Sequence, residues 1–316
     1  MSIKIKEIFD IYFNNTMDFV DFFSLNKMDY LETKTFRGRE IVAYKEGFNK
    51  LRLLHRFLNE AIFNRVKIID DVVFSYRKKV NVFDCVYPHR LNPFIFKTDI
   101  KSFFPSFTRI FIQSKLENIF KEFIISDINE YLPKIVDLVS YNDCLPVGFS
   151  TSPSLSNILF SDADKKLKEF SASNEYIYTR YSDDLIISSE KEIHKNEIFS
   201  SIQQIINSEC ETFVLNFDKT KLLKKGGVRK IMGVSILPDG HISVDKAIKN
   251  NIETKLHYIS KLNNVNSQDP EIMEVKRYLS GMINYISTID EAYINKLKRK
   301  YGSTIVEMFL RKSLVK

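Results

Sequence analysis

The sequence predicts a mixed α+β fold, and three observations lead to this. Apolar residues recur at helical spacing near the start of the chain, where Ile8, Phe9, Tyr12 and Phe13 share one face. The middle third holds short runs of strand-forming residues separated by turn residues. Residues 245–316 are basic and nearly all helical in character. Helices are therefore expected at both ends of the chain, with a sheet between them.

Composition limits the class of protein. The 316 residues are enough to bury a substantial core, in one unit of two or three subdomains. The 47 basic and 40 acidic residues give a net charge of +7, which suits a phosphate-bearing partner without requiring one. The 3 cysteines are far apart and lack metal-ligand spacing, which is typical of a reducing compartment. No run resembles a signal peptide or a membrane span, so a cytoplasmic protein with no membrane partner is expected.

The first part of the chain is predicted to be mostly helical. Helical spacing continues to about residue 35, and the segment 36–44, around Gly38, breaks it and is expected to form a short β-segment. A helix from Lys50 to about Phe63 follows, with arginines between its apolar positions. The next strand approaches Asp99 through the sequence PFIFKTD and leads into a turn at Pro105.

The remaining elements follow from apolar spacing and turn residues. They are a helical region at 109–139, a Pro/Gly/Ser loop feeding a helix that starts at Ser152-Pro153, two strands around Asp183 and Asp184, a helix from about Glu192 to Cys210, and a strand–turn–strand region at 213–244 with turns at Gly226-Gly227 and Asp239-Gly240.

Asp183 and Asp184 lie between two strand-forming runs. Two adjacent negative charges at a turn are costly unless the turn is solvated or a divalent cation is bound. Magnesium prefers hard oxygen ligands and keeps positions free for phosphate oxygens, as nucleotide polymerisation requires. The pair alone is a weak signal, and a solvated hairpin tip is the better explanation of it when it is taken by itself.

Asp99 is the candidate third carboxylate. It ends an apolar strand, where a charged side chain has to be paired or to bind a metal. If the strands that carry Asp99 and Asp183 are neighbours in a sheet, the carboxylates converge. Two magnesium ions could then bridge a primer hydroxyl and an incoming triphosphate. A helix N-cap or a buried ion pair are the alternatives for Asp99.

Five segments, in order along the chain, resemble motifs A to E of the reverse transcriptases. They are FKTDIKSFFPS at 96–106, LPVGFSTSPSLSN at 145–157, YSDD at 181–184, LNFDKTK at 215–221 and Ile231-Met232-Gly233-Val234. The resemblance covers roughly residues 37–290. It implies an RNA-directed DNA polymerase with a right-hand fold. The N-terminal helices and part of the fingers would occupy 1–95, the palm with its antiparallel sheet and an interleaved fingers segment 96–235, and a helical thumb 236–316.

The compact length and the segment 281–286, GMINYI, resemble bacterial retron reverse transcriptases and their defence-associated relatives. Residues 85–89 keep only the histidine of that group's Asn-Ala-x-x-His, and residues 231–233 keep only the glycine of its Val-Thr-Gly. The resemblance implies a structured non-coding RNA as template, its cDNA as product, dNTPs as substrates, and an effector protein of an anti-phage defence system. A group II intron-like or other defence-associated reverse transcriptase, and a non-catalytic RNA-binding scaffold, are the alternatives. His89 either contacts RNA or caps local structure.

The resemblance also implies roles for individual residues. Asp99, Asp183 and Asp184 would be catalytic and, together with Ile100, would hold two Mg²⁺ ions, for which Mn²⁺ could substitute. Lys219 would act near the leaving pyrophosphate. Lys221 is the neighbouring alternative, and an exposed surface lysine is the other interpretation of both.

Three further residues are implied to bind the nucleotide. Arg39, with Arg37 as a substitute, would grip the triphosphate with its guanidinium fork, unless it is a solvated side chain. Phe104 would be the steric gate against a ribose 2′-hydroxyl, unless it packs in the core. Gly148 would shape the nucleotide floor, beside Val147, where the family commonly has glutamine. A phosphate track is expected on the thumb, with a solvated helix face as the alternative for any one side chain; its residues are Lys276, Arg277, Lys296, Lys298 and Arg299.

Overall fold

The computed structural model describes residues 3–36, 38–47, 49–261 and 269–310, apart from the side chain of Arg39. The chain divides into two compact units. The first comprises Met1–Lys78, Phe96–Ile187 and Ile193–Lys221, and the second Lys79–Ile95, Ser188–Glu192 and Leu222–Lys316. The subdomain boundaries at residues 95 and 235 stay a prediction.

The chain begins with helices packed on an aromatic core, followed by a hairpin. The elements are α1 (Ile5–Phe13), α2 (Phe19–Ser24), η1 (Lys27–Tyr30), β1 (Leu31–Phe36), β2 (Arg39–Tyr44), α3 (Lys50–Ala61) and η2 (Phe63–Arg65). Phe9 is fully buried, and its ring centroid lies 4.5 Å from that of Phe13 and 5.2 Å from that of Phe57. The contact with Phe57 is edge-to-face, a geometry whose attraction adds to the apolar area that the rings bury.

The predicted extension of helix to residue 35 is wrong, because residues 31–36 form β1. Thr33 pairs with Val42 and Thr35 with Glu40, in an antiparallel hairpin with β2. The segment LETKTF carries two β-branched threonines at alternate positions, which suits a strand. The β-segment expected at 36–44 is confirmed as β2, over Arg39–Tyr44.

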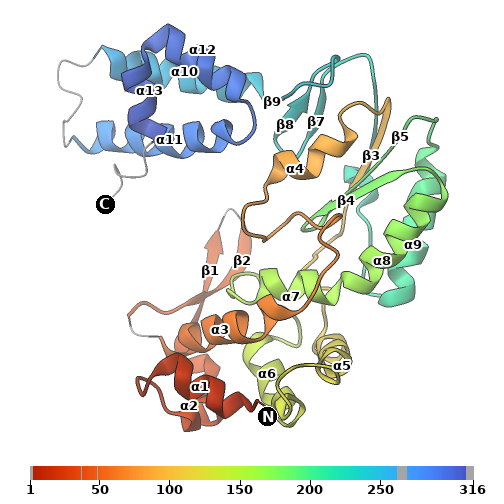
Figure 1. The fold of residues 1–316 in the computed structure, drawn as a ribbon, viewed down its shortest axis with the longest axis vertical. Helices are drawn as coiled ribbons and strands as arrows, with labels where there is room; N and C mark the ends of the chain where they lie inside the picture. The colour runs from red at the N-terminus through yellow and green to blue at the C-terminus, as the bar shows by residue number, and fades with distance from the viewer. Residues whose placement is uncertain (1–2, 37, 48, 262–268, 311–316) are drawn as a thin grey trace. The chain divides into compact units, whose positions relative to one another are not determined.

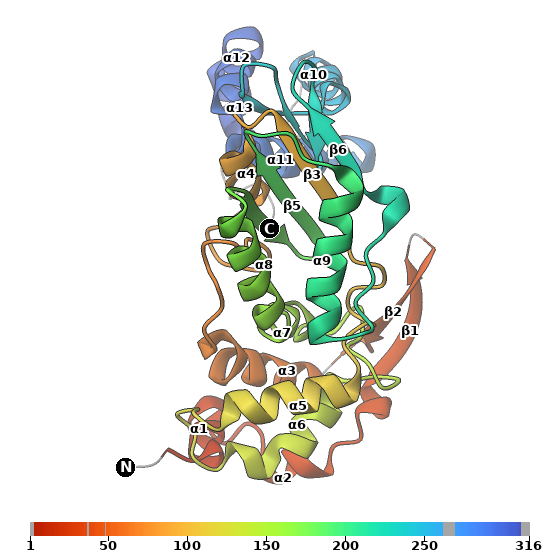
Figure 2. The same ribbon diagram turned by 90° about the vertical axis from the view of Figure 1, so that its right-hand side faces the viewer.

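The largest sheet of the described residues has four strands in the order β4-β5-β3-β6. Its strands are β3 (Phe94–Asp99), β4 (Ile177–Tyr181), β5 (Asp184–Ser189) and β6 (Lys221–Lys224). Figure 2 shows α8 (Ser161–Ser173) and α9 (Lys195–Glu209) side by side on one face of this sheet. The expected helical region at 109–139 is two helices, α5 (Arg109–Phe120) and α6 (Leu132–Val139), joined through η4 (Ile128–Tyr131). The helix expected from Ser152-Pro153 is α7 (Ser152–Leu159), with proline in its first turn.

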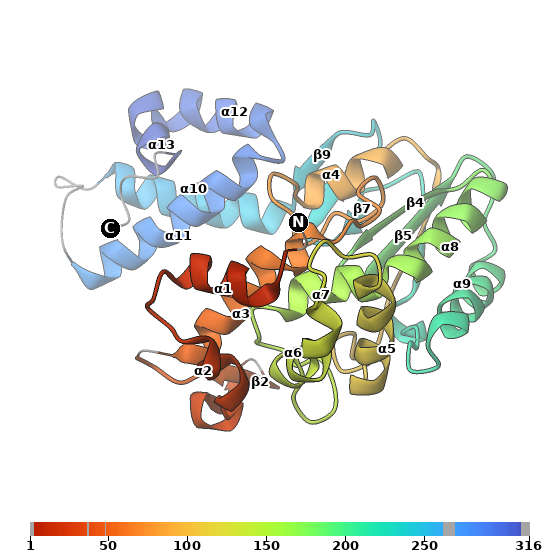
Figure 3. The ribbon, with the colours of Figure 1, turned by 60° about the horizontal axis from the view of Figure 1, so that its bottom comes forward.

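The second unit contains a small antiparallel sheet and a group of helices. Strands β7 (Arg229–Ile231), β8 (Val234–Ile236) and β9 (Ile242–Val244) follow one another in that order. The turns expected at Gly226-Gly227 and Asp239-Gly240 lie between β6 and β7 and between β8 and β9. Figures 1 and 3 show the four helices that follow as one bundle: α10 (Lys246–Ser260), α11 (Pro270–Ser287), α12 (Glu291–Tyr301) and α13 (Ser303–Leu310).

The helical character expected for the C-terminal region is thus confirmed over the described residues. Asp290 caps α12 by accepting from the Tyr293 backbone N–H at 2.9 Å, and it also accepts from Lys249 Nζ at 3.0 Å. The short helices α4 (Val82–Val86) and η3 (Tyr87–His89) also belong to this unit. Within the described ranges, no helix has both the length and the apolar character that crossing a bilayer requires.

Candidate active site

The turn between β4 and β5 carries two of the predicted carboxylates. Ser182 and Asp183 form the turn, and Ser182 has a left-handed backbone with φ of 59°. The Ile100 backbone N–H donates to the Asp183 carbonyl at 3.0 Å, so the end of β3 lies directly beside the turn. The strands that carry Asp99 and Asp183 are thus neighbours in the sheet, which is the arrangement that convergent carboxylates require.

Asp99 is 6% exposed, and its two carboxylate oxygens differ. Oδ2 accepts from Lys219 Nζ at 2.9 Å. Oδ1 is buried and has no hydrogen-bond partner among the described residues. A buried carboxylate oxygen without a partner is unfavourable unless a cation or a donor reaches it. The structure therefore leaves one oxygen of Asp99 available for a ligand.

Asp184 has an unusual affinity for protons. Burial raises its pKa to about 6, and the negative charges of Asp183 and then Asp99 act in the same direction. Lys97 and Lys219 lower the pKa and offset part of this effect. Mutual repulsion of this kind requires the carboxylates to lie near one another. A bound cation would relieve it.

The residues fit magnesium by their chemistry. Carboxylate oxygens are the hard ligands that Mg²⁺ prefers, and the buried Ile100 could offer only its backbone carbonyl. In the part of the chain that the structure describes, no three Asp, Glu, His or Cys side chains lie close enough together to hold one ion as they stand. Asp99 forms an ion pair with the Lys219 ammonium through one of its two oxygens. The donor set and the unrelieved charge are nevertheless those that a divalent cation would satisfy.

Of the two candidate lysines, Lys219 is the one that contacts Asp99. It lies in η5 (Phe217–Lys219), its side chain is 62% exposed, and it forms an ion pair with Asp99. Lys221 begins β6 and is exposed. The choice between the two lysines therefore falls on Lys219 for contact with Asp99.

Phe104 is less buried than the two phenylalanines near it in the sequence. Phe103 and Phe107 are buried, with exposed fractions of 5% and 0%, whereas Phe104 is only partly buried. Its ring centroid lies 6.4 Å from that of Tyr76. Core packing thus describes the two neighbouring phenylalanines better than it describes Phe104.

Gly148 has a direct structural reason to be glycine. Its φ is 117°, and a Cβ there would lie 2.2 Å from the carbonyl oxygen of Val42 in β2. The Val42 N–H donates to the Val147 carbonyl at 2.9 Å, so the loop before α7 packs closely on β2, the strand that begins with Arg39. The side chain of Arg39 and all of Arg37 lie outside the described residues.

His89 is fully buried in the second unit. Its Nδ1 lies 2.7 Å from the Ser188 hydroxyl, and burial lowers its pKa to about 3. A side chain with no exposed surface cannot contact RNA in this conformation. Of the two interpretations of His89, the local structural one therefore applies.

Two charged residues at the site were not predicted from the sequence. Arg180 in β4 and Asp164 in α8 are completely buried and form a bidentate pair, with Nε–Oδ1 at 2.8 Å and Nη2–Oδ2 at 2.7 Å. Arg180 Nη1 also donates to the Ser182 carbonyl at 3.0 Å, so the pair holds the backbone of the turn. Asp164 shares the buried face of α8 with Leu167, and a carboxylate on an apolar helical stripe was the available signal.

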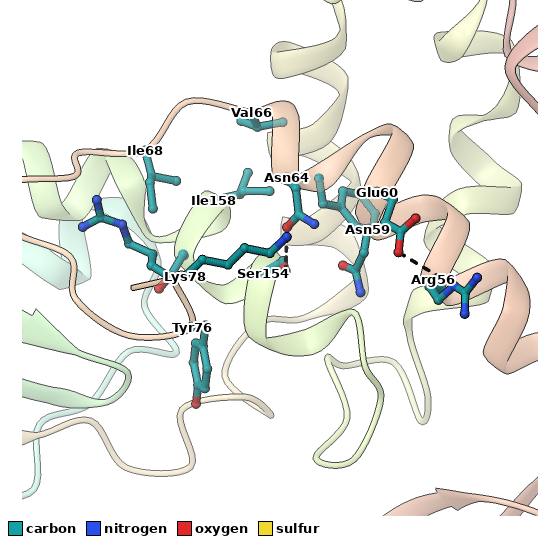
Figure 4. A pocket seen from close by; sticks show the side chains of 13 residues that line it. Arg56, Asn59, Glu60, Asn64, Val66, Ile68, Tyr76, Lys78, Ser154 and Ile158 are labelled. Carbon is teal, nitrogen blue, oxygen red and sulfur yellow. Dashed lines mark hydrogen bonds and ion pairs between the residues drawn. The ribbon is translucent and has the colours of Figure 1, made fainter. Parts of the chain in front are cut away.

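A cavity of about 700 Å³ lies in the first unit, between α3, η2, α7 and the segment that ends at Lys78. Figure 4 shows its polar side chains, among them the amides of Asn59 and Asn64 and the cationic groups of Arg56 and Lys78. Amides that both donate and accept, together with positive charge, suit a polynucleotide strand. None of these residues was identified from the sequence.

The family is established by comparison with known proteins. The model of the family "Reverse transcriptase (RNA-dependent DNA polymerase)" matches residues 44–236, which include Asp99, Asp183 and Asp184. The chain therefore belongs to the reverse transcriptase family and is an RNA-directed DNA polymerase.

Among individual proteins, the chain is similar to retron reverse transcriptases of Escherichia coli. It is 26% identical to the Retron Ec73 reverse transcriptase over 81% of this chain and 82% of that protein. It is 28% identical to the Retron Ec86 enzyme over 72% of this chain and 68% of that protein. A telomerase structure from Candida albicans with a fragment of telomeric RNA matches at a TM-score of 0.44 and 13% identity, over 82% of this chain and 47% of that chain.

Proposed function

We propose that the chain synthesises cDNA on a structured non-coding RNA template, in the manner of a retron reverse transcriptase. The single observation that carries the proposed chemistry is the Asp99 carboxylate, which lies beside the Asp183-Asp184 turn with its Oδ1 unpartnered. The similarity to retron enzymes over most of their length supports the choice of template.

The chain's residues would divide the work of nucleotide addition. Asp99, Asp183, Asp184 and the carbonyl of Ile100 would hold two magnesium ions, which when bound activate the primer hydroxyl and neutralise the triphosphate. Lys219 already reaches Asp99, and it would move to stabilise the leaving pyrophosphate once a cation neutralises that carboxylate.

Selection of the nucleotide would depend on residues around this centre. Phe104 would exclude the ribose 2′-hydroxyl, and Arg39 would hold the triphosphate. Gly148 would allow the motif B loop to pack against β2, and this packing would fix the position of the loop beneath the nucleotide. The cavity lined by Asn59, Asn64 and Arg56 would take part of the template strand.

The chain would form the fingers, palm and thumb of a right-hand polymerase. Residues 1–95 would form the N-terminal helices and part of the fingers, 96–235 the palm with an interleaved fingers segment, and 236–316 the thumb. The thumb's basic residues would follow the phosphates of the RNA/DNA hybrid. The enzyme would act in the cytoplasm, beside an effector protein, in an anti-phage defence system.

Sequencing of the nucleic acid that co-purifies with the protein tests this function. A defined structured RNA joined to cDNA, lost in an Asp183→Ala/Asp184→Ala variant, is the expected result. DNA copied from unrelated RNAs would point instead to a group II intron-like or other defence-associated reverse transcriptase. RNA without any cDNA in both proteins would contradict the proposal.

A further inference from the structure

Tyr76 reaches the turn between β4 and β5 from a distant part of the chain. Its hydroxyl lies 2.8 Å from the Oγ of Ser182, the residue that precedes Asp183. The Phe74 N–H donates to the Arg180 carbonyl at 2.9 Å, and the Arg180 N–H donates to the Val72 carbonyl at 2.7 Å. The segment that carries Tyr76 is therefore fixed against β4 just before the turn.

The backbone of Tyr76 also indicates a constrained position. Its φ is 58°, in the left-handed region that costs a bulky side chain roughly 1–2 kcal/mol. The neighbouring hydrogen bonds to β4 over-determine this conformation. Tyr76 is thus held in place although its side chain is 45% exposed.

The exposed ring of Tyr76 lies close to Phe104. The two ring centroids are 6.4 Å apart, and the ring planes are inclined by 42°. Figure 4 shows the Tyr76 ring at the edge of the cavity, with its hydroxyl directed away from Asn64 and Ser154. Two partly exposed aromatic rings from different segments therefore meet beside the Ser182–Asp184 turn.

We propose that Tyr76 is a specificity-determining residue for nucleotide addition: it backs Phe104 against the sugar of the incoming nucleotide and is anchored by Ser182. This inference rests on the proposed function, in which Phe104 is the steric gate. Phe104 can exclude a 2′-hydroxyl only if its ring cannot rotate away from the sugar. The Tyr76 ring limits that movement, and the hydrogen bond to Ser182 keeps Tyr76 from moving with it.

The test measures the ratio of kcat/KM for a deoxynucleotide to that for the ribonucleotide with the same base, on a defined RNA template and primer. Tyr76→Ala is expected to lower this ratio about tenfold, chiefly through a lower KM for the ribonucleotide, because steric discrimination in a pocket is typically worth about 10–200-fold. Tyr76→Phe and Ser182→Ala are each expected to lower the ratio about two- to fivefold, as the loss of one hydrogen bond allows.

A double-variant cycle isolates the anchoring bond. Tyr76→Phe combined with Ser182→Ala should match either single variant, since both remove the same interaction. Tyr301→Phe is the matched control: it removes a hydroxyl of α12 that donates to the Glu253 carbonyl of α10 at 3.1 Å, and it should leave the ratio unchanged.

Phe104→Ala separates failure of this inference from failure of the gate. If Phe104→Ala lowers the ratio and Tyr76→Ala does not, the role of Tyr76 is overturned while the gate stands. If Phe104→Ala is active with an unchanged ratio, the gate and the role of Tyr76 both fall. Thermal unfolding identifies variants that do not fold. If Tyr76→Ala is one of them, an unchanged ratio in Tyr76→Phe and Ser182→Ala overturns the inference.

Discussion

Lys219 Nζ lies 2.9 Å from Asp99 Oδ2, so an ammonium already occupies one side of the carboxylate that ends β3. The two roles proposed for these residues are therefore linked. A cation that binds Asp99 weakens its attraction for Lys219, and the freed lysine can then serve the departing pyrophosphate.

Lys219→Gln tests this link. Removing the ammonium is expected to lower the magnesium concentration needed for half-maximal rate, because no positive charge competes for Asp99. The maximal rate of single-turnover incorporation should fall about tenfold, as for the loss of one positioned charge. Lys221→Gln is the matched control and should change neither quantity. A half-saturating magnesium concentration that is unchanged or higher in Lys219→Gln contradicts the competition.

Asp184→Asn tests the electrostatic strain at the turn. The folded protein raises the pKa of Asp184 to about 6, so the carboxylate ionises less readily in the folded chain than in the unfolded one. Without metal, its contribution to stability is lost as pH rises through about 6. The variant should therefore be more stable than wild type at pH 8, by on the order of 2 kcal/mol, and should gain little at pH 4.

Thermal unfolding in a chelator measures this difference, with Asp10→Asn, at an exposed position of α1, as the control. Added magnesium should stabilise the wild type at pH 8 and should stabilise Asp184→Asn less. If Asp184→Asn is more stable than the wild type by the same amount at pH 4 and at pH 8, repulsion among the carboxylates is not the cause of the stabilisation.

The buried histidines predict acid sensitivity. Burial lowers the pKa of His55 to about 4 and that of His89 to about 3, whereas both titrate near 6.5 when unfolded. Between these pH values the unfolded chain binds protons that the folded chain does not bind. The free energy of unfolding therefore falls as pH drops from about 6.5 towards 4. Each histidine contributes up to about 1.4 kcal/mol per pH unit in that window. The free energy of unfolding of His89→Gln, measured with denaturant, should fall less steeply with decreasing pH than that of the wild type, by about that amount per pH unit. An unchanged pH dependence would exclude the contribution of His89.

Variants of the Arg180–Asp164 pair distinguish its contribution to stability from its role in positioning the turn. Asp164→Leu alone leaves a buried guanidinium without its partner and should cost about 3–5 kcal/mol of stability. Arg180→Met together with Asp164→Leu removes both charges and should recover most of that loss. The Ser182 carbonyl still lacks its donor in the double variant, so kcat should remain at least about tenfold below wild type. A double variant with normal stability and normal kcat would show that the pair does not position the turn.

The sequence indicated the carboxylates because their chemistry is local. Asp183-Asp184 between two strands and Asp99 at a strand end can be recognised without knowing their partners, and the sheet order β4-β5-β3 brings those strand ends together. Partners across the fold were harder to predict. Asp164 and Arg180 are 16 residues apart, and nothing in the sequence pairs them until α8 is placed against β4.

Tyr76 illustrates the same limit more strongly. Its contact with Ser182 joins positions 106 residues apart, and its left-handed backbone leaves no pattern in the residue types. The strand at 31–36 was missed for a different reason. Its hydrogen bonds come from β2, so the pairing rather than the local apolar spacing decides the element.

Magnesium-dependent incorporation of labelled dNTP on an RNA template tests most directly whether Asp99, Asp183 and Asp184 form one catalytic centre. The wild type and three variants, Asp99→Asn, Asp183→Asn and Asp184→Asn, are compared after thermal unfolding has shown that each is folded. Activity in the wild type and a loss of at least about a thousandfold in Asp99→Asn and Asp183→Asn is the expected result, because these residues would hold the metals on which the reaction depends. Undiminished incorporation by a folded Asp99→Asn or Asp183→Asn variant would contradict the account.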